Sequence, residues 1–141
     1  MKRATGSRQR GSTLIDICAA CVTGSLTMAL ALPSYQSYLE RTRRGDAVSA
    51  LQRVQQAQAR HIAQHGQYAL RVDQLDEAIP ELSDRGLYRI AMFSDGPDNF
   101  EARATAVPDR EQAKDPGCAR LTLRITHGVI AYEPSIHCWN P

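Results

Sequence analysis

The stretch Gly11-Ser12-Thr13-Leu14-Ile15-Asp16 decides the fold, because a basic leader ends there and a long apolar run begins. Residues 1–10 contain four basic side chains and no acid, whereas residues 17–32 contain no charge. In a secretory signal peptide the apolar region comes before the cleavage site and small residues mark its far end. Here the small residue Gly11 comes before the apolar run. Cleavage at Gly11 would therefore leave the apolar helix on the mature protein.

Residues 12–32 predict a transmembrane helix. The segment has 21 residues and one charge, Asp16, and about 20 residues are enough to cross a bilayer. A buried helix of a soluble protein is the alternative, and the basic leader and the uncharged length argue against it. A lone carboxylate in a membrane helix marks a functional site by default. Four small or hydroxylated residues dilute the apolar character of the segment: Thr23, Gly24, Ser25 and Thr27.

Three arginines, Arg41, Arg43 and Arg44, follow the apolar segment and form a candidate binding surface. Their partner would be phospholipid head groups, DNA or the acids of adjacent subunits. The alternative is that these arginines lie on an ordinary solvent-exposed face and bind no partner. The formal net charge of +2 is too small to argue for a nucleic-acid partner by itself.

The start of the chain resembles the type IV prepilin signature, in which a basic leader and a glycine precede a long helix. Gly11, Thr13, Leu14 and Ile15 match that signature, and residues 33–38 resemble the pilin sequence around a helix-kinking proline. Two residues depart from the pattern: Ser12 replaces the usual Phe, and Asp16 replaces the usual Glu.

This resemblance implies a processing and assembly pathway. The prepilin peptidase would cut between Gly11 and Ser12 and methylate Ser12, and Asp16 would then pair with the terminal amine of a neighbouring subunit. The implied partners are this peptidase, other pilin subunits in a helical filament, and the inner membrane before assembly. The implied location is a single-pass inner-membrane protein with its C-terminal domain in the periplasm, and later the pilus at the cell surface.

Residues 33–66 predict an amphipathic second half of the same helix. Apolar or buried-type side chains recur at spacings of four, three, four and four, from Ala47 to Ile62, which is a helical period. Pro33 lacks an amide donor and is expected to kink the helix. Gly66 is a good stop signal.

Residues 67–141 predict a small β-sheet region. Four runs alternate between apolar and polar residues, and turn-forming residues separate them within each hairpin: 87–93, 100–107, 121–125 and 129–132. We therefore expect an α+β fold, in which the amphipathic helix covers one apolar face of a roughly four-stranded antiparallel sheet. In the connection before the sheet, residues 76–79 are expected to form a turn of helix.

Cys118 and Cys138 flank the last hairpin and favour a disulfide. Such a bridge closes a loop of about 20 residues, contributes roughly 3 kcal/mol, and implies an oxidising compartment. The rival interpretation is a metal site with His127 or His137, but the spacing fits no zinc pattern. The sequence around Cys118 and Cys138-Trp139 also resembles the C-terminal part of the pilus-assembly minor pilins, where a bridge closes the last hairpin.

Two other pairs of residues allow both a functional and a purely structural interpretation. Cys18 and Cys21 form a C-x-x-C pattern, but no strand precedes it as in a thioredoxin-like motif, so two small apolar side chains are favoured. His61 and His65 lack a third ligand, so a solvated helix end is favoured over a metal site. No Ser-His-acid order or Gly-rich phosphate loop occurs. We therefore predict no metal, no cofactor and no enzymatic activity.

The sequence favours a structural subunit, more specifically a minor pilin of a type IV pilus that supports pilus biogenesis, adhesion or motility. Three alternatives remain. One is a type II secretion pseudopilin, and another is a DNA-binding competence pilin that uses Arg43 and Arg44. The third is a membrane-tethered thiol oxidoreductase that uses Cys18 and Cys21. DNA is therefore an alternative partner that no pattern in the sequence supports by itself.

Overall fold

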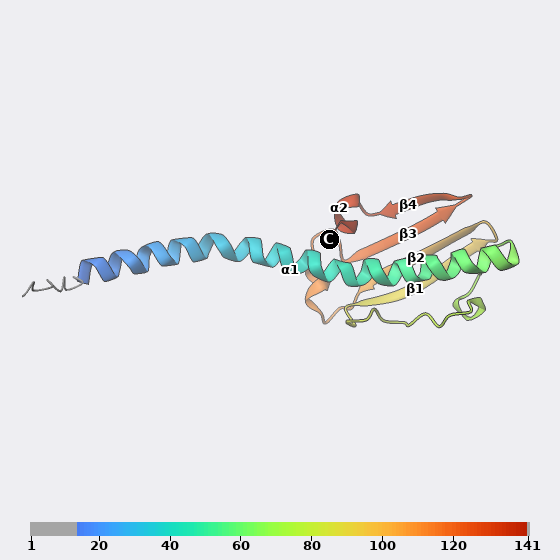
Figure 1. The fold of residues 1–141 in the computed structure, drawn as a ribbon, viewed down its shortest axis with the longest axis horizontal. Coiled ribbons are helices and arrows are strands. Elements are labelled where there is room, and N and C mark those ends of the chain that lie inside the picture. The colour runs from blue at the N-terminus through green and yellow to red at the C-terminus, as the bar shows by residue number, and fades with distance from the viewer. Residues whose placement is uncertain (1–13, 141) are drawn as a thin grey trace, which may run out of the picture. The chain divides into compact units, whose positions relative to one another are not determined.

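The computed structural model describes residues 14–140, with the side chains at 15–16 and 23–34 outside the description. It contains a long helix, a four-stranded sheet and three short helical turns (Figure 1). The elements in chain order are α1 (Leu14–His65), η1 (Val72–Gln74), β1 (Tyr88–Gly96), β2 (Asn99–Ala106), η2 (Glu111–Lys114), β3 (Arg120–Thr126), β4 (Val129–Glu133) and α2 (Ile136–Trp139). The predicted α+β fold is confirmed.

The chain divides into two compact units, Met1–Ser37 and Tyr38–Pro141. In the first unit, α1 begins at Leu14 and remains helical through Pro33. The kink expected at Pro33 stays a prediction.

The transmembrane helix expected over residues 12–32 is not supported. Within the part of the chain that the structure describes, no helix combines the length and the apolar character that a membrane crossing requires. Thr23, Gly24, Ser25 and Thr27 lie in this segment and lower its hydropathy.

The sheet in the second unit is an antiparallel meander with the strand order β1-β2-β3-β4. Ile90 pairs with Ala104, and Leu123 pairs with both Ala102 and Tyr132. The turn between β3 and β4 consists of His127 and Gly128, which have φ angles of 49° and 79°. Two successive positive φ angles are typical of a type I′ turn, whose twist matches that of the flanking strands.

The core lies between one face of this sheet and the second half of α1. Small residues on both sides, such as Ala47 and Ala102, allow the helix to lie close to the strands. The largest completely buried side chains of the cluster are Tyr88, Phe100, Leu51, Leu121 and Leu123. The helix contributes the apolar stripe that its spacing predicted, and this stripe contacts the predicted apolar face of the sheet.

Polar ties hold the second half of α1 to the loops around it. The carboxylate of Asp46 accepts hydrogen bonds from Ser83 Oγ at 2.5 Å and from the Arg85 amide at 3.1 Å. Further along, Gln58 is completely buried. Its side chain donates to the Ala69 carbonyl and accepts from the Ala69 amide, both at 2.9 Å. Gln58 therefore belongs to the stripe because it fixes the loop that follows the helix.

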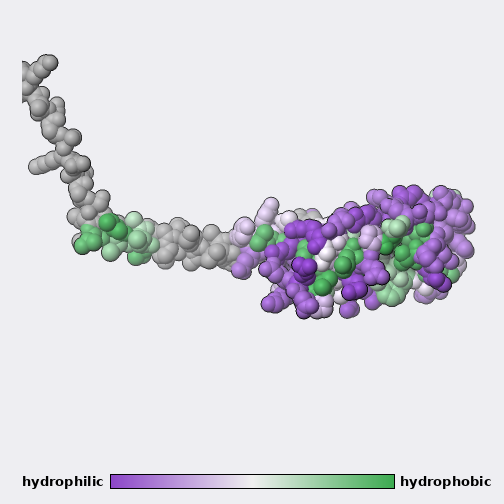
Figure 2. Space-filling view, turned by 90° about the horizontal axis from the view of Figure 1, so that it is seen from below, coloured by the Kyte–Doolittle hydropathy of each residue, from purple (hydrophilic) through white to green (hydrophobic). Residues whose placement is uncertain are grey.

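The connection from Gly66 to Leu87 differs from the prediction in one detail. The helical turn is η1, and residues 76–79 are not helical. The Gln74 side-chain oxygen accepts hydrogen bonds from the amides of Leu70 and Arg71, and this fixes the turn four residues earlier than expected. A view from below shows that the surface of the second unit is mainly hydrophilic with separate hydrophobic patches (Figure 2).

Candidate nucleic-acid interface

The face of the sheet turned away from α1 carries the polar side chains of the four strands. Side chains alternate between the two faces of a strand, so the same alternation that builds the core also builds this second face. We call it the outer face. Its residues are Arg89, Ala91, Phe93, Glu101, Arg103, Thr105, Arg120, Thr122, Arg124, Ala131 and Glu133.

The strand register arranges the four arginines of the outer face in three rows. The first row crosses Arg89, Thr105 and Arg120. The second includes Arg103, and the third includes Arg124. Neighbouring strands lie about 4.8 Å apart. Side chains from three strands are therefore close enough to act on one ligand.

Glu101 lies between two of these arginines. Its carboxylate accepts hydrogen bonds from Arg124 Nη2 at 2.8 Å and Nε at 3.1 Å, and it also pairs with Arg103. Burial alone raises the pKa of Glu101, but the hydrogen bonds from Arg124 and Arg103 outweigh it and hold that pKa below its ordinary value. Arg124 also contacts Glu133 at 3.2 Å. The result is a continuous charged network across β2, β3 and β4.

An aromatic ring lies beside this network. The Arg103 guanidinium carbon lies 4.7 Å from the centre of the Phe93 ring, and the Phe93 side chain is 48% exposed. Phe93 and Arg124 also line a shallow, open pocket of about 210 Å³. An exposed ring next to guanidinium groups is the combination on which nucleic-acid bases stack.

The other two arginines are freer of acids. Arg89 approaches Glu81 only at 3.8 Å. Among the described residues, no acid lies within ion-pair distance of Arg120. Guanidinium groups without a local counter-charge are suited to phosphate, because they bind it through two parallel hydrogen bonds. The row from Arg89 to Arg120 is therefore the part of the outer face with the least local neutralisation and the best suited to an anion.

The predicted arginine cluster on α1 is not one surface. Arg41 is exposed. Arg43 is half-buried and pairs with Glu111 of η2. Arg44 is only 4% exposed. The assignment of Arg44 to a binding surface was therefore wrong, because its side chain points into the molecule.

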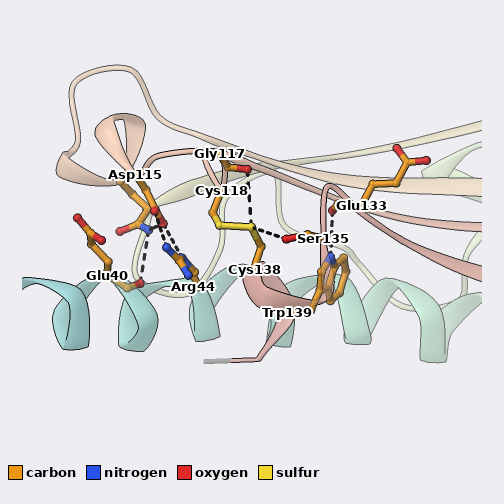
Figure 3. The surroundings of a disulfide bond; sticks show 10 residues. Glu40, Arg44, Asp115, Gly117, Cys118, Glu133, Ser135, Cys138 and Trp139 are labelled. Atoms are coloured by element: carbon orange, nitrogen blue, oxygen red, sulfur yellow. Dashed lines mark hydrogen bonds and ion pairs between the residues drawn. A yellow bond between two sulfur atoms is a disulfide. The ribbon is translucent and has the colours of Figure 1, made fainter.

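Arg44 forms a buried ion pair with Asp115, which follows η2 (Figure 3). Arg44 Nε and Nη2 donate to the two Asp115 oxygens at 2.7 and 2.6 Å. Gln112 Nε2 donates to the same carboxylate at 2.5 Å. The hydrogen bond to Asp115 raises the pKa of Arg44 above its ordinary value, against the lowering effect of burial. Arg44 therefore joins α1 to the segment before β3.

The predicted disulfide between Cys118 and Cys138 is present. Both cysteines are 2% exposed, and their Cα atoms lie 5.5 Å apart. The bridge joins α2 to the residues before β3, beside the Arg44 pair (Figure 3). Trp139 packs on Tyr132 and donates through Nε1 to the Glu133 carbonyl at 2.9 Å.

Gly11 and Ser12 lie outside the described residues, and of Asp16 and Pro33 only the helical backbone is described. The thiols of Cys18 and Cys21 are exposed and not bridged.

The predicted solvated helix end holds for His65, which is exposed, but not for His61, which is buried with its ring stacked on that of His65. In the part of the chain that the structure describes, no group of three or more His, Cys, Asp or Glu side chains is suited to hold a metal ion.

The arginines of the outer face were missed by the sequence analysis. The signal was present: Arg89, Arg103, Arg120 and Arg124 all occupy the polar phase of the alternation in three different strands. Only the register between the strands shows that these positions share one face.

A family model described as "Type IV minor pilin ComP, DNA uptake sequence receptor" matches residues 33–122. The match runs from Pro33 in α1 into β3, and it includes three of the four outer-face arginines. A search of curated proteins finds no match to the chain.

Proposed function

The chain belongs to the family of the type IV minor pilin ComP, the DNA uptake sequence receptor, and on this premise we propose that it is a minor pilin that binds DNA. The proposed DNA-binding surface is the outer face of the sheet. The observation that carries the proposal is the open row from Arg89 to Arg120, next to the Arg103–Phe93 stack. Among the alternatives, this proposal favours the DNA-binding competence pilin, because it names a binding surface in addition to a structural role in the pilus.

The distribution of charge supports the outer face as the surface for DNA. Residues 1–11 contain four of the 17 basic residues and none of the 15 acids. The rest of the chain therefore has 13 basic residues and 15 acids, which is a formal net charge of −2. A chain with this balance is repelled by DNA as a whole. Binding therefore needs a local excess of positive charge, and the outer face has four arginines against Glu101 and Glu133.

The experiment measures DNA affinity as a function of salt for the processed chain. Replacing both Arg89 and Arg120 with alanine is expected to weaken binding and to lower the salt slope by about two, because each lost phosphate contact lowers it by about 0.9. Arg71→Ala is the matched control. Arg71 is an exposed arginine before η1, paired with Asp73 and outside the outer face. An equal loss in the control and the double variant would refute this location.

A gain-of-affinity variant sharpens the test. Glu101→Gln removes the carboxylate that neutralises Arg103 and Arg124 while keeping a similar shape. DNA should bind several-fold more tightly to this variant at low salt, with a steeper salt slope. Unchanged or weaker binding by a folded Glu101→Gln protein would exclude the network from the interface.

We further propose the assembly pathway that the resemblance implies. The peptidase would cut after Gly11 and methylate Ser12, the inner membrane would hold the subunit before assembly, and Asp16 would pair with the amine of a neighbouring subunit. Subunits that meet in a non-closing way form filaments. The test is the intact mass of the protein from cells with and without the peptidase. A chain that starts near Met1 in both strains would refute the processing step.

A further inference from the structure

The pocket beside Phe93 lies at the end of the outer face nearest the turn between β1 and β2. It has a volume of about 210 Å³, and its lining includes Phe93, Asp95, Asn99, Glu101 and Arg124. These side chains come from three neighbouring strands. Pockets for drug-sized ligands start at about 300 Å³, so this one suits a smaller flat group, such as one nucleobase.

The Phe93 ring provides a surface on which a base can stack. The Arg103 guanidinium lies over this ring, with its carbon 4.7 Å from the ring centre, yet 48% of the Phe93 side chain stays exposed. Bases stack on aromatic rings and on guanidinium planes. In a duplex, neighbouring base pairs cover the faces of each base, and only its edges are accessible from the grooves. A base that stacks on Phe93 must therefore be unpaired.

The charges in the pocket favour a base over a phosphate. Glu101 is neutralised by its pairs with Arg103 and Arg124. Asp95 is exposed, and among the described residues no cation lies within ion-pair distance of its carboxylate. A carboxylate without a counter-charge repels phosphate. It accepts hydrogen bonds from the amino groups of bases, such as cytosine N4, whereas thymine carries the O4 acceptor at the corresponding position.

We propose that this pocket binds one unpaired base of single-stranded DNA, and that it selects a base with an exocyclic amino group, such as cytosine. The base stacks on Phe93 and donates its amino group to Asp95. The inference rests on the proposed function, because the row from Arg89 to Arg120 holds the phosphates of the same strand. Arg89 lies four residues from Phe93 along β1, or about 13 Å. Single-stranded sites cover roughly 4–16 nucleotides, so one strand reaches both places.

The first test compares single-stranded and duplex DNA of the same sequence and length by fluorescence anisotropy. Phe93→Leu keeps an apolar side chain and removes the flat ring. It should weaken binding of the single strand at least about fivefold, because a base–aromatic stack contributes that much or more. Its affinity for the duplex should stay unchanged. The salt slope for the single strand should also stay unchanged, because no phosphate contact is lost.

The second test uses oligo(dC) and oligo(dT) of equal length, which carry the same number of phosphates and bases of the same ring size. The natural chain should bind oligo(dC) at least about fivefold more tightly. Asp95→Ala should bring this ratio close to one. Asp98→Ala is the matched control, because Asp98 is an exposed carboxylate close to Asp95 but does not line the pocket. It changes the net charge equally and should keep the preference for oligo(dC).

The outcomes separate this inference from the proposed function. If Phe93→Leu weakens binding of both DNA forms equally, or of neither, the pocket does not hold an unpaired base. A ratio near one in the natural chain, or one that Asp95→Ala leaves unchanged, overturns the selection of the base by Asp95. In each of these cases, a loss of affinity in the Arg89 and Arg120 double variant would still support the proposed function. No DNA binding by the natural chain would refute both.

Discussion

At the residue scale, Glu101 and Arg44 show that an ionisable side chain acts according to its partners rather than its charge alone. Glu101 lies among arginines on the outer face and is held ionised by them. Arg44 follows Arg43 in the sequence, but it is buried and pairs with Asp115 through Nε and Nη2. The first residue controls the charge of the proposed DNA surface, and the second contributes to the stability of the fold.

We expect the contribution of Glu101 to stability to depend on pH. The folded pKa of Glu101 is depressed, whereas an unfolded glutamate titrates near about 4.3. The contribution is therefore present above about pH 4.3 and is lost as pH falls through the lower folded pKa. Thermal unfolding of the natural chain and Glu101→Gln should differ at pH 6, and the difference should shrink below pH 4. A difference that stays constant from pH 6 to pH 3 would contradict the depressed pKa.

Arg44→Ala is expected to destabilise the second unit by about 3–5 kcal/mol, because it leaves the Asp115 carboxylate buried without its charge partner. Chemical denaturation of the variant measures this loss. Its DNA affinity should equal that of the natural chain under conditions where both are folded. Exposed Arg41→Ala serves as the control, with little expected effect on stability. A mild loss in Arg44→Ala would mean that the pair is hydrated.

At the scale of elements, the sequence determines local structure well and distant partners poorly. The four strands and the helical stripe were predicted because alternation and helical period are local signals. The burial of Arg44 was not, because its partner Asp115 lies 71 positions away and only the fold brings them together. The arginines of the outer face were missed for the same reason. The alternation in each strand shows which side chains are polar, but only the register between strands shows which arginines are neighbours.

The Cys118–Cys138 bridge should stabilise the sheet, because it joins the residues before β3 to α2, which follows β4. It closes a loop over a sequence separation of 20 residues, and reduction should cost about 3 kcal/mol. The melting temperature should fall by roughly 10–20 °C in a reducing agent. A variant with serine at both positions should melt at the lower temperature with or without the reductant. A reductant effect in that variant would show that the bridge is not the cause.

At the scale of the whole molecule, four of the 17 basic residues lie in the leader and four lie on the outer face of the sheet. A chain that keeps residues 1–11 gains four cations and no acid. We expect this uncut chain to bind DNA of any sequence more tightly than the processed chain, with a salt slope larger by up to about four. Titration of both forms with two unrelated DNA sequences measures the effect. Equal salt slopes would mean that the leader does not contact DNA.

The polar ties along α1 have a mechanical consequence. Arg44, Asp46 and Gln58 each hold the helix to a different segment beside the sheet. In the proposed filament, a pull on bound DNA is transmitted through each subunit along this helix. The ties are then loaded in shear and share the force, so the helix must slide as a whole instead of peeling away turn by turn. Force spectroscopy, with handles near Tyr38 and in the β1–β2 turn, should show one large rupture, whereas a series of small ruptures would indicate peeling. The arrangement suits the proposed role of a subunit that binds DNA while it is held in a filament.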